Sequence, residues 1–99
     1  MGVLDEFFAG LEGFEWDEAN SEKNWHRHAV RQVEVEQTLL NRPLLLGVDV
    51  KHSQHEPRFI ALGQTDAQRR LTVVFTVRGA RVRVISARPM SPAERRIYG

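Results

Sequence analysis

The second half of the chain alternates apolar and polar residues in the way that β-strands do. Two runs, RRLTVVFTV (69–77) and RVRVISAR (81–88), are dominated by β-branched residues, and an RGAR turn signal lies between them. Two earlier runs, PLLLGVDV (43–50) and RFIALGQT (58–65), also have the pattern of strands. The sequence therefore predicts four consecutive strands after Pro43.

The first half has the spacing of helices. FEW (14–16) is a short strand candidate, and Asp17 after it is a suitable N-cap for a helix that ends near His28. The next segment, AVRQVEVEQTLLNRP (29–43), fits both a strand and a helix, and we favour a helix that the proline terminates. We therefore expect two helices before the strands, with residues 1–13 as a lead-in.

A third helix is predicted at the C-terminal end. Ser91 precedes a proline at the first helical position, and Glu94 follows three residues after the serine, which is a capping box. The helix should end near Tyr98. The order of elements predicts an α+β fold: a mainly antiparallel four-stranded sheet, packed against two N-terminal helices, with a short C-terminal helix.

Composition narrows the class of protein. A chain of 99 residues with 41% hydrophobic and 27% charged residues is expected to form a single domain over residues 1–99. The absence of cysteine excludes a disulfide framework, a thiolate zinc site and a thiol nucleophile. Neither a membrane-spanning apolar run nor a basic leader is present, so we expect a cytoplasmic protein.

The net charge of +1 hides an asymmetry between the two halves. Residues 58–99 hold nine arginines and two acidic residues, a net charge of +7, whereas residues 1–57 have a net charge of −6. Such polarity indicates an anionic ligand, either a nucleic-acid backbone or an acidic protein segment. Alternatively, the arginines only solvate strand faces and pair with the acidic half.

A two-residue turn at Gly79-Ala80 would orient the arginines. It places Arg78 opposite Arg81, Thr76 opposite Arg83, and Val74 opposite Ile85. The core face then carries Leu71, Val73, Phe75, Val77, Val82 and Val84, with Ser86 and Arg88 at its far end. The other face carries Arg78, Arg81 and Arg83. Arginines directly opposite one another repel unless a carboxylate or phosphate lies between them, so this face predicts anion binding.

Two further groups of polar residues carry weaker signals. Asn20, Asn24 and His28 form one stripe on the first helix, and the histidine is either a general acid or base or a partner for the last carbonyls of its own helix. The loop sequence HSQHE, with His52, His55 and Glu56, has a metal-binding spacing but no fourth ligand, and we predict no metal.

Several motifs together resemble one family. They are FEWD, N-x-x-R-H-A-V, NRPLL, D-x-KHS-x-x-EPRF-x-ALGQT, VVFTVRG and RVRVISARPMSPAERRIY, which cover residues 14–98 in order. They are similar to BrnT, the toxin of type II toxin–antitoxin modules, and residues 1–13 lie outside the resemblance. The resemblance implies a RelE-like ribonuclease that halts translation. It also implies a BrnA antitoxin partner, a heterotetrameric complex, and contact with operator DNA only through the antitoxin.

The resemblance and the basic face together suggest site residues. RNA cleavage by 2′-hydroxyl attack needs a base, an acid and cationic stabilisation of the phosphorane, and arginine supplies charge without deprotonating. His28 is the first candidate for the acid or base, with Glu56 and Tyr98 as secondary candidates. We expect a phosphate cradle of Arg58, Arg78, Arg83 and Arg88, further RNA contacts from Arg81 and Asn24, an antitoxin contact at Arg95, and neither metal nor cofactor.

Two positions depart from the pattern of the family, and two other functions stay open. Members often carry lysine where Asn20 stands and glycine where Ala29 stands, so activity could be reduced or lost. The alternatives are a non-catalytic RNA- or ribosome-binding module, and a protein-interaction subunit whose basic face docks an acidic helix.

Overall fold

The structure of the chain is a computed structural model that describes residues 8–52 and 56–99. The predicted helices are present, with bounds close to those expected: α2 (Glu18–His28), α3 (Gln32–Leu40) and α4 (Pro92–Tyr98), and a 3-10 turn, η1 (Val50–His52). The strands are β1 (Gly13–Glu15), β2 (Leu45–Val48), β3 (Phe59–Gln64), β4 (Arg70–Arg78) and β5 (Arg81–Pro89). The α+β class is confirmed.

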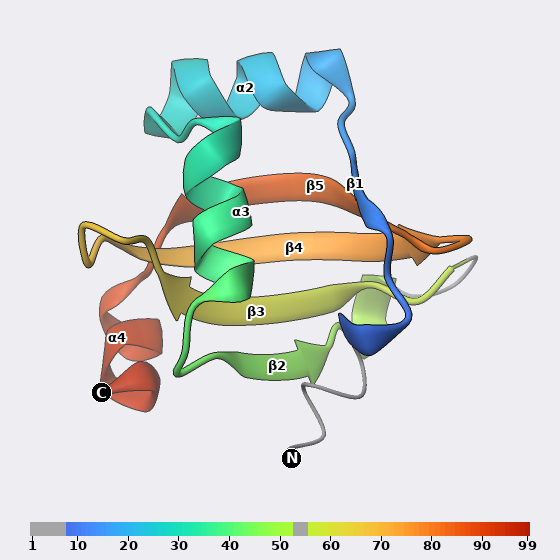
Figure 1. Cartoon of the computed structure of the whole chain (residues 1–99). Helices are drawn as coiled ribbons and strands as arrows, with labels where there is room; N and C mark the ends of the chain where they lie inside the picture. The colour runs from blue at the N-terminus through green and yellow to red at the C-terminus, as the bar shows by residue number, and fades with distance from the viewer. Residues whose placement is uncertain (1–7, 53–55) are drawn as a thin grey trace.

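The strands form one sheet in the order β1-β5-β4-β3-β2, shown in Figure 1. The four strands after Pro43 pair antiparallel, as predicted, but the sheet has five strands rather than four. The fifth is β1, which pairs in parallel with β5 and sets Glu15 beside Arg83. A three-residue segment can join the sheet because it adds to a free edge.

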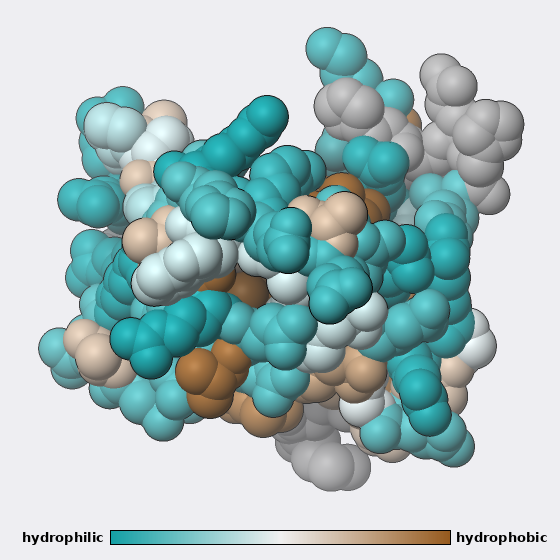
Figure 2. Space-filling model, turned by 90° about the horizontal axis from the view of Figure 1, so that it is seen from above, coloured by the Kyte–Doolittle hydropathy of each residue, from teal (hydrophilic) through white to brown (hydrophobic). Residues whose placement is uncertain are grey.

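The two N-terminal helices are positioned differently. Helix α3 lies across one face of the sheet and contacts β3 and β4, whereas α2 runs along β5 (Figure 1). The close approach of α3 requires Gly63 of β3, because a Cβ there would lie 2.8 Å from the carbonyl oxygen of Thr38. Seen from the side of α2, the surface is mainly hydrophilic (Figure 2).

The ends of α2 follow from local sequence. The side chain of Asp17 accepts a hydrogen bond from the backbone N–H of Asn20 at 3.1 Å and caps the helix, as predicted. At the other end Ala29 takes a left-handed conformation, with φ of 52° and ψ of 44°. Glycine adopts this conformation with less strain than alanine. The glycine that the resembled family often carries at this position would therefore suit the end of α2 better than Ala29 does.

The core lies between α3 and the sheet. Phe75 of β4 is completely buried, and the ring of Phe59 lies 5.4 Å away, centre to centre. The predicted core residues Leu71, Val73, Phe75, Val82 and Val84 are buried, and Val77 is partly buried against them. These positions confirm the predicted inward face of the β4–β5 hairpin up to Val84.

Beyond Val84 the predicted register is wrong. Arg78 does lie opposite Arg81 and Thr76 opposite Arg83, but Val74 pairs with Ser86 instead of Ile85. A β-bulge leaves Ile85 as an extra residue in β5 and reverses the alternation beyond it. Ala87 therefore enters the core, with none of its surface exposed.

Candidate nucleic-acid interface

The bulge in β5 brings a fourth arginine onto the basic side of the sheet. Arg83 pairs with Thr76 and Arg88 with Thr72, and these two threonines lie four residues apart on one regular strand. Residues of one strand that are an even number of positions apart share a face, so Arg88 lies on the same side as Arg83. The prediction that Arg88 lies at the far end of the core face is wrong. We call Arg78, Arg81, Arg83 and Arg88 the arginine face.

The members of the arginine face do not converge on one point. Thr72, opposite Arg88, is separated from Arg78 by six residues of β4, which corresponds to roughly 20 Å of strand. Arg58 directly precedes β3, at the hairpin end. The four predicted cradle arginines therefore cannot all hold a single phosphate, although they can follow a nucleic-acid backbone.

Carboxylates neutralise three of these arginines. Arg83 contacts Asp17 at 2.8 Å and Glu15 at 3.3 Å. Arg78 contacts Glu56 at 3.3 Å, and the hydrogen bonds that it donates to this carboxylate raise the pKa of the arginine. These pairs correspond to the second interpretation of the charge asymmetry, in which the arginines pair with the acidic half of the chain.

The third pair is the tightest. Arg88 makes two hydrogen bonds to the carboxylate of Glu94, at 2.7 and 2.9 Å, and Thr72 donates to the same carboxylate at 2.9 Å. The bonds from Arg88 are the main reason why the pKa of Glu94 falls from 4.5 to about 2. Ser91 and Glu94 also form the predicted capping box of α4. Arg88 thus holds α4 on the sheet.

His28 lies at the opposite end of α2 from Asp17, in the last helical position. Arg69 donates to the carbonyl oxygens of His28 and Ala29, each at 2.8 Å, and contacts Glu34 at 3.1 Å. The last carbonyls of the helix are therefore held by Arg69, forty residues away in sequence, and no local pattern pointed to this contact. The half-buried imidazole is not required for that task.

Two asparagines of the polar stripe on α2 form hydrogen bonds with the backbone of β5. Asn24 is 2% exposed, and its Oδ1 accepts a hydrogen bond from the backbone N–H of Ala87 at 3.1 Å. Asn20 donates to the carbonyl of Val84 at 3.4 Å. Both asparagines bind the edge of β5 where β1 has ended. Asn24 is therefore buried and lies on no RNA-accessible surface, so its predicted RNA contact is not supported.

The other predicted residues lie around α4. The hydroxyl of Tyr98 donates to the carbonyl of Pro43 at 2.6 Å, and burial raises the pKa of this tyrosine. Arg95 is exposed on the same helix and lines a hollow of about 460 Å³ together with Gln68, Arg69, Arg70 and Pro89. We call this the basic hollow; sequence reasoning did not find it.

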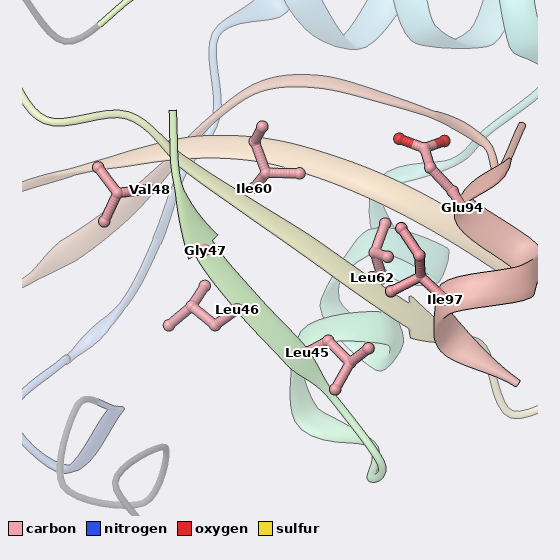
Figure 3. Close-up of a pocket in the computed structure, with 8 residues that line it drawn as sticks. All are labelled: Leu45, Leu46, Gly47, Val48, Ile60, Leu62, Glu94 and Ile97. Atoms are coloured by element: carbon pink, nitrogen blue, oxygen red, sulfur yellow. The ribbon is translucent and has the colours of Figure 1, made fainter. Parts of the chain in front are cut away.

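A second hollow near α4 is apolar. It measures about 340 Å³ and is lined by Leu45, Leu46, Gly47, Val48, Ile60, Leu62, Glu94 and Ile97 (Figure 3). Leu62 of β3 and Ile97 of α4 lie side by side there, with the carboxylate of Glu94 at one end. The groove offers no cation, so it is unsuited to phosphate.

Within residues 8–52 and 56–99, no group of three or more histidine or acidic side chains is placed to hold a metal ion. The weak HSQHE signal involves His55, which lies outside the described residues, and the side chain of His52 is likewise not described. In the same part of the chain, every helix is too short or too polar to cross a membrane.

Comparison with known proteins gives one family. Residues 16–94 match the model described as "Ribonuclease toxin, BrnT, of type II toxin-antitoxin system". No curated protein matches the chain. Among solved structures, the crystal structure of the ribonuclease toxin BrnT from Brucella abortus superposes with a TM-score of 0.58 at 23% identity, covering 80% of this chain and 96% of that one. This likeness supports the fold.

Proposed function

We propose that this chain, which belongs to the BrnT family of ribonuclease toxins of type II toxin–antitoxin systems, is an endoribonuclease that cuts RNA and thereby inhibits translation. The observation that carries the proposal is the family match, which runs from the residue before Asp17 to the capping residue Glu94 of α4. The exposed arginines and the histidine at the end of α2 are consistent with it.

The proposed reaction needs only acid–base and electrostatic catalysis. A base takes the proton of a ribose 2′-hydroxyl, and the oxygen attacks the adjacent phosphorus. The bond from phosphorus to the 5′-oxygen then breaks, and an acid protonates that oxygen. The products are a 2′,3′-cyclic phosphate and a 5′-hydroxyl. We assign His28 as the acid or base, because imidazole is the side chain that enzymes use most often for proton transfer.

Arginines would stabilise the charge of the phosphorane. Arg78 suits this role, because its side chain is 49% exposed and that of Glu56 40% exposed, so a phosphate can replace the carboxylate at little cost. We propose that Arg81 and Arg83 extend this contact along the backbone, with Arg58 beside them. Arg88 is bound to Glu94 more tightly and serves mainly to position α4.

Two secondary candidates have other partners. Glu56 accepts the bonds of Arg78, and would become available as a base when phosphate displaces it. Tyr98 would first have to release the carbonyl of Pro43. We therefore rank Glu56 above Tyr98.

A type II system pairs the toxin with a protein antitoxin. We propose that a BrnA-type antitoxin covers the arginine face with carboxylates, that Arg95 contributes a contact, and that the complex contains two copies of each chain and reaches operator DNA through the antitoxin. Complementary charge would neutralise and occlude the RNA surface in one step. Light scattering on the co-purified complex gives its stoichiometry.

The test is cleavage of a 5′-labelled RNA by the purified chain, with and without EDTA. We expect fragments that end in 2′,3′-cyclic phosphate, unchanged by EDTA, and no cleavage of a fully 2′-O-methylated RNA. RNA binding without cleavage would instead identify a non-catalytic RNA-binding module. Neither binding nor cleavage would favour the protein-interaction subunit.

A further inference from the structure

The carboxylates divide the basic side chains of the C-terminal half into two groups. Arg78, Arg83 and Arg88 each have an acidic partner. Within the described residues, neither Arg70 nor Arg95 contacts a carboxylate, although both are exposed and both line the basic hollow. Arg81 at the hairpin is also exposed and contacts no carboxylate of the described residues, but Arg70 and Arg95 are the two that share a hollow.

We propose that the basic hollow binds a backbone phosphate of the RNA, held by Arg70 and Arg95. The proposal rests on the proposed function, since it assumes that the chain binds RNA, and it adds a phosphate site at the other end of the sheet.

The hollow is built by three separate segments. Gln68 and Arg69 come from the turn between β3 and β4, Arg70 begins β4, Pro89 ends β5, and Arg95 belongs to α4. Its volume of about 460 Å³ is comparable with that of pockets that hold small ligands, roughly 300–1,000 Å³.

Two of its three arginines have contacts that restrict their side chains. Arg69 is held by the carbonyls of His28 and Ala29 and by Glu34, so it forms part of the wall. The guanidinium carbon of Arg70 lies 5.9 Å from the centre of the Tyr98 ring, a cation–π contact that restricts the arginine but leaves its N–H donors available. Arg95 faces the same space from one turn earlier on α4.

The lining favours phosphate over a protein segment. The five lining residues include three arginines and a glutamine, and none is a carboxylate or a large apolar residue. Guanidinium groups match phosphate oxygens two at a time, whereas protein interfaces usually bury apolar side chains at their centre. The apolar hollow near α4 is lined by such apolar side chains and therefore resembles a protein interface more closely.

The hollow also adjoins the predicted catalytic histidine. Arg69 lines it and bonds directly to the backbone of His28, so a phosphate held there lies at the His28 end of the molecule. Arg78 lies at the far end of β4. An RNA that spans both ends would run along the sheet.

The experiment is a titration of a labelled, 2′-O-methylated twelve-nucleotide RNA, followed by fluorescence anisotropy at several salt concentrations. The double variant Arg70→Ala/Arg95→Ala is compared with Lys51→Ala/Arg96→Ala, which removes two exposed charges outside the hollow. Two lost phosphate contacts should lower the slope of log affinity against log salt by about 1.4. The control should keep the slope of the parent.

The outcomes separate this site from the function on which it rests. If the parent binds no RNA, the proposed function is wrong and the site with it. If the parent binds RNA and the salt slope falls equally in both double variants, only the proposed site is wrong. Unchanged RNA binding with weakened antitoxin binding would make the hollow an antitoxin site instead. Arg95→Glu, at an exposed helix position, gives the same readout if the double variant is unfolded.

Discussion

The contact between Glu94 and Arg88 should contribute a large share of the stability of the protein, and Glu94→Gln tests this. Glutamine keeps an oxygen that can accept from Ser91 and Thr72, so the substitution removes mainly the charge. The side chain of Glu94 is 21% exposed, and solvent therefore screens the pair only partly.

The size of the effect follows from the pKa. The bonds from Arg88, chiefly, lower the pKa of Glu94 from 4.5 to about 2, against the effect of burial. A difference of about 2.5 in pKa corresponds to about 3 kcal/mol, as an upper value, since 1.36 kcal/mol corresponds to one pH unit. For a domain of this size that predicts a fall in melting temperature of at most roughly 12–24 °C at pH 7.

The pH dependence has a definite sign. A carboxylate whose pKa is lower in the folded state stabilises fully above pH 4.5, and this contribution is lost as the pH falls toward 2. The difference between parent and variant should therefore shrink by about 1 kcal/mol at pH 4 and by about 2 kcal/mol at pH 3.

Urea denaturation of parent, Glu94→Gln and the control Glu22→Gln at pH 7, 4 and 3 measures these differences. Glu22 is an exposed acid on α2, and the same substitution there should change the free energy of unfolding by no more than about 0.5 kcal/mol. If the two variants are equally stable at pH 7, or if the gap for Glu94→Gln does not narrow in acid, the account of this contact is wrong.

Four further substitutions test the site and the fold. His28→Gln should reduce RNA cleavage by about 10²–10⁴ and barely change the melting temperature, and a folded variant within about threefold of the parent would remove the histidine from the chemistry. Arg83→Ala should lower the salt slope of RNA binding by about 0.7, and an unchanged slope would take Arg83 off the RNA surface. Ala29→Gly should raise the free energy of unfolding by about 0.5–1 kcal/mol, because it relieves a left-handed backbone; thermal denaturation that shows a loss would contradict this. Gly63→Ala should lower it by about 1–3 kcal/mol, because its Cβ would meet the Thr38 carbonyl, and equal stability in the same assay would show that α3 can move.

The elements of the fold could be predicted because their signals are local. Asp17 and Ser91 mark helix starts by their chemistry, and the β-branched runs mark β4 and β5. The bulge in β5 was not predicted, although the sequence of this strand indicates it. Apolar residues of β5 occupy even positions up to Val84 and the odd positions 85 and 87 after it. Such a change of phase is the expected mark of an inserted residue.

The site was less predictable, because its contacts join residues distant in sequence. The facing of Arg78, Arg81 and Arg83 followed from the turn, and that part is confirmed. The carboxylate partners of Arg78 and Arg83 come from other segments, and the walls of the basic hollow also come from separate segments. Nothing local shows that Arg69 reaches the end of α2, since the two are brought together only by the complete sheet.

The asparagines of α2 have a consequence for how the protein unfolds. Beyond the end of β1, the outer edge of β5 is completed by side chains of a helix, because Asn24 holds the amide of Ala87 and Asn20 the carbonyl of Val84. The exchange of the Ala87 amide hydrogen with solvent should therefore report the opening of α2 as well as that of the sheet. Helix α2 and the edge of β5 would then separate as one cooperative unit. Substitutions that destabilise α2 would therefore increase local opening in the middle of β5.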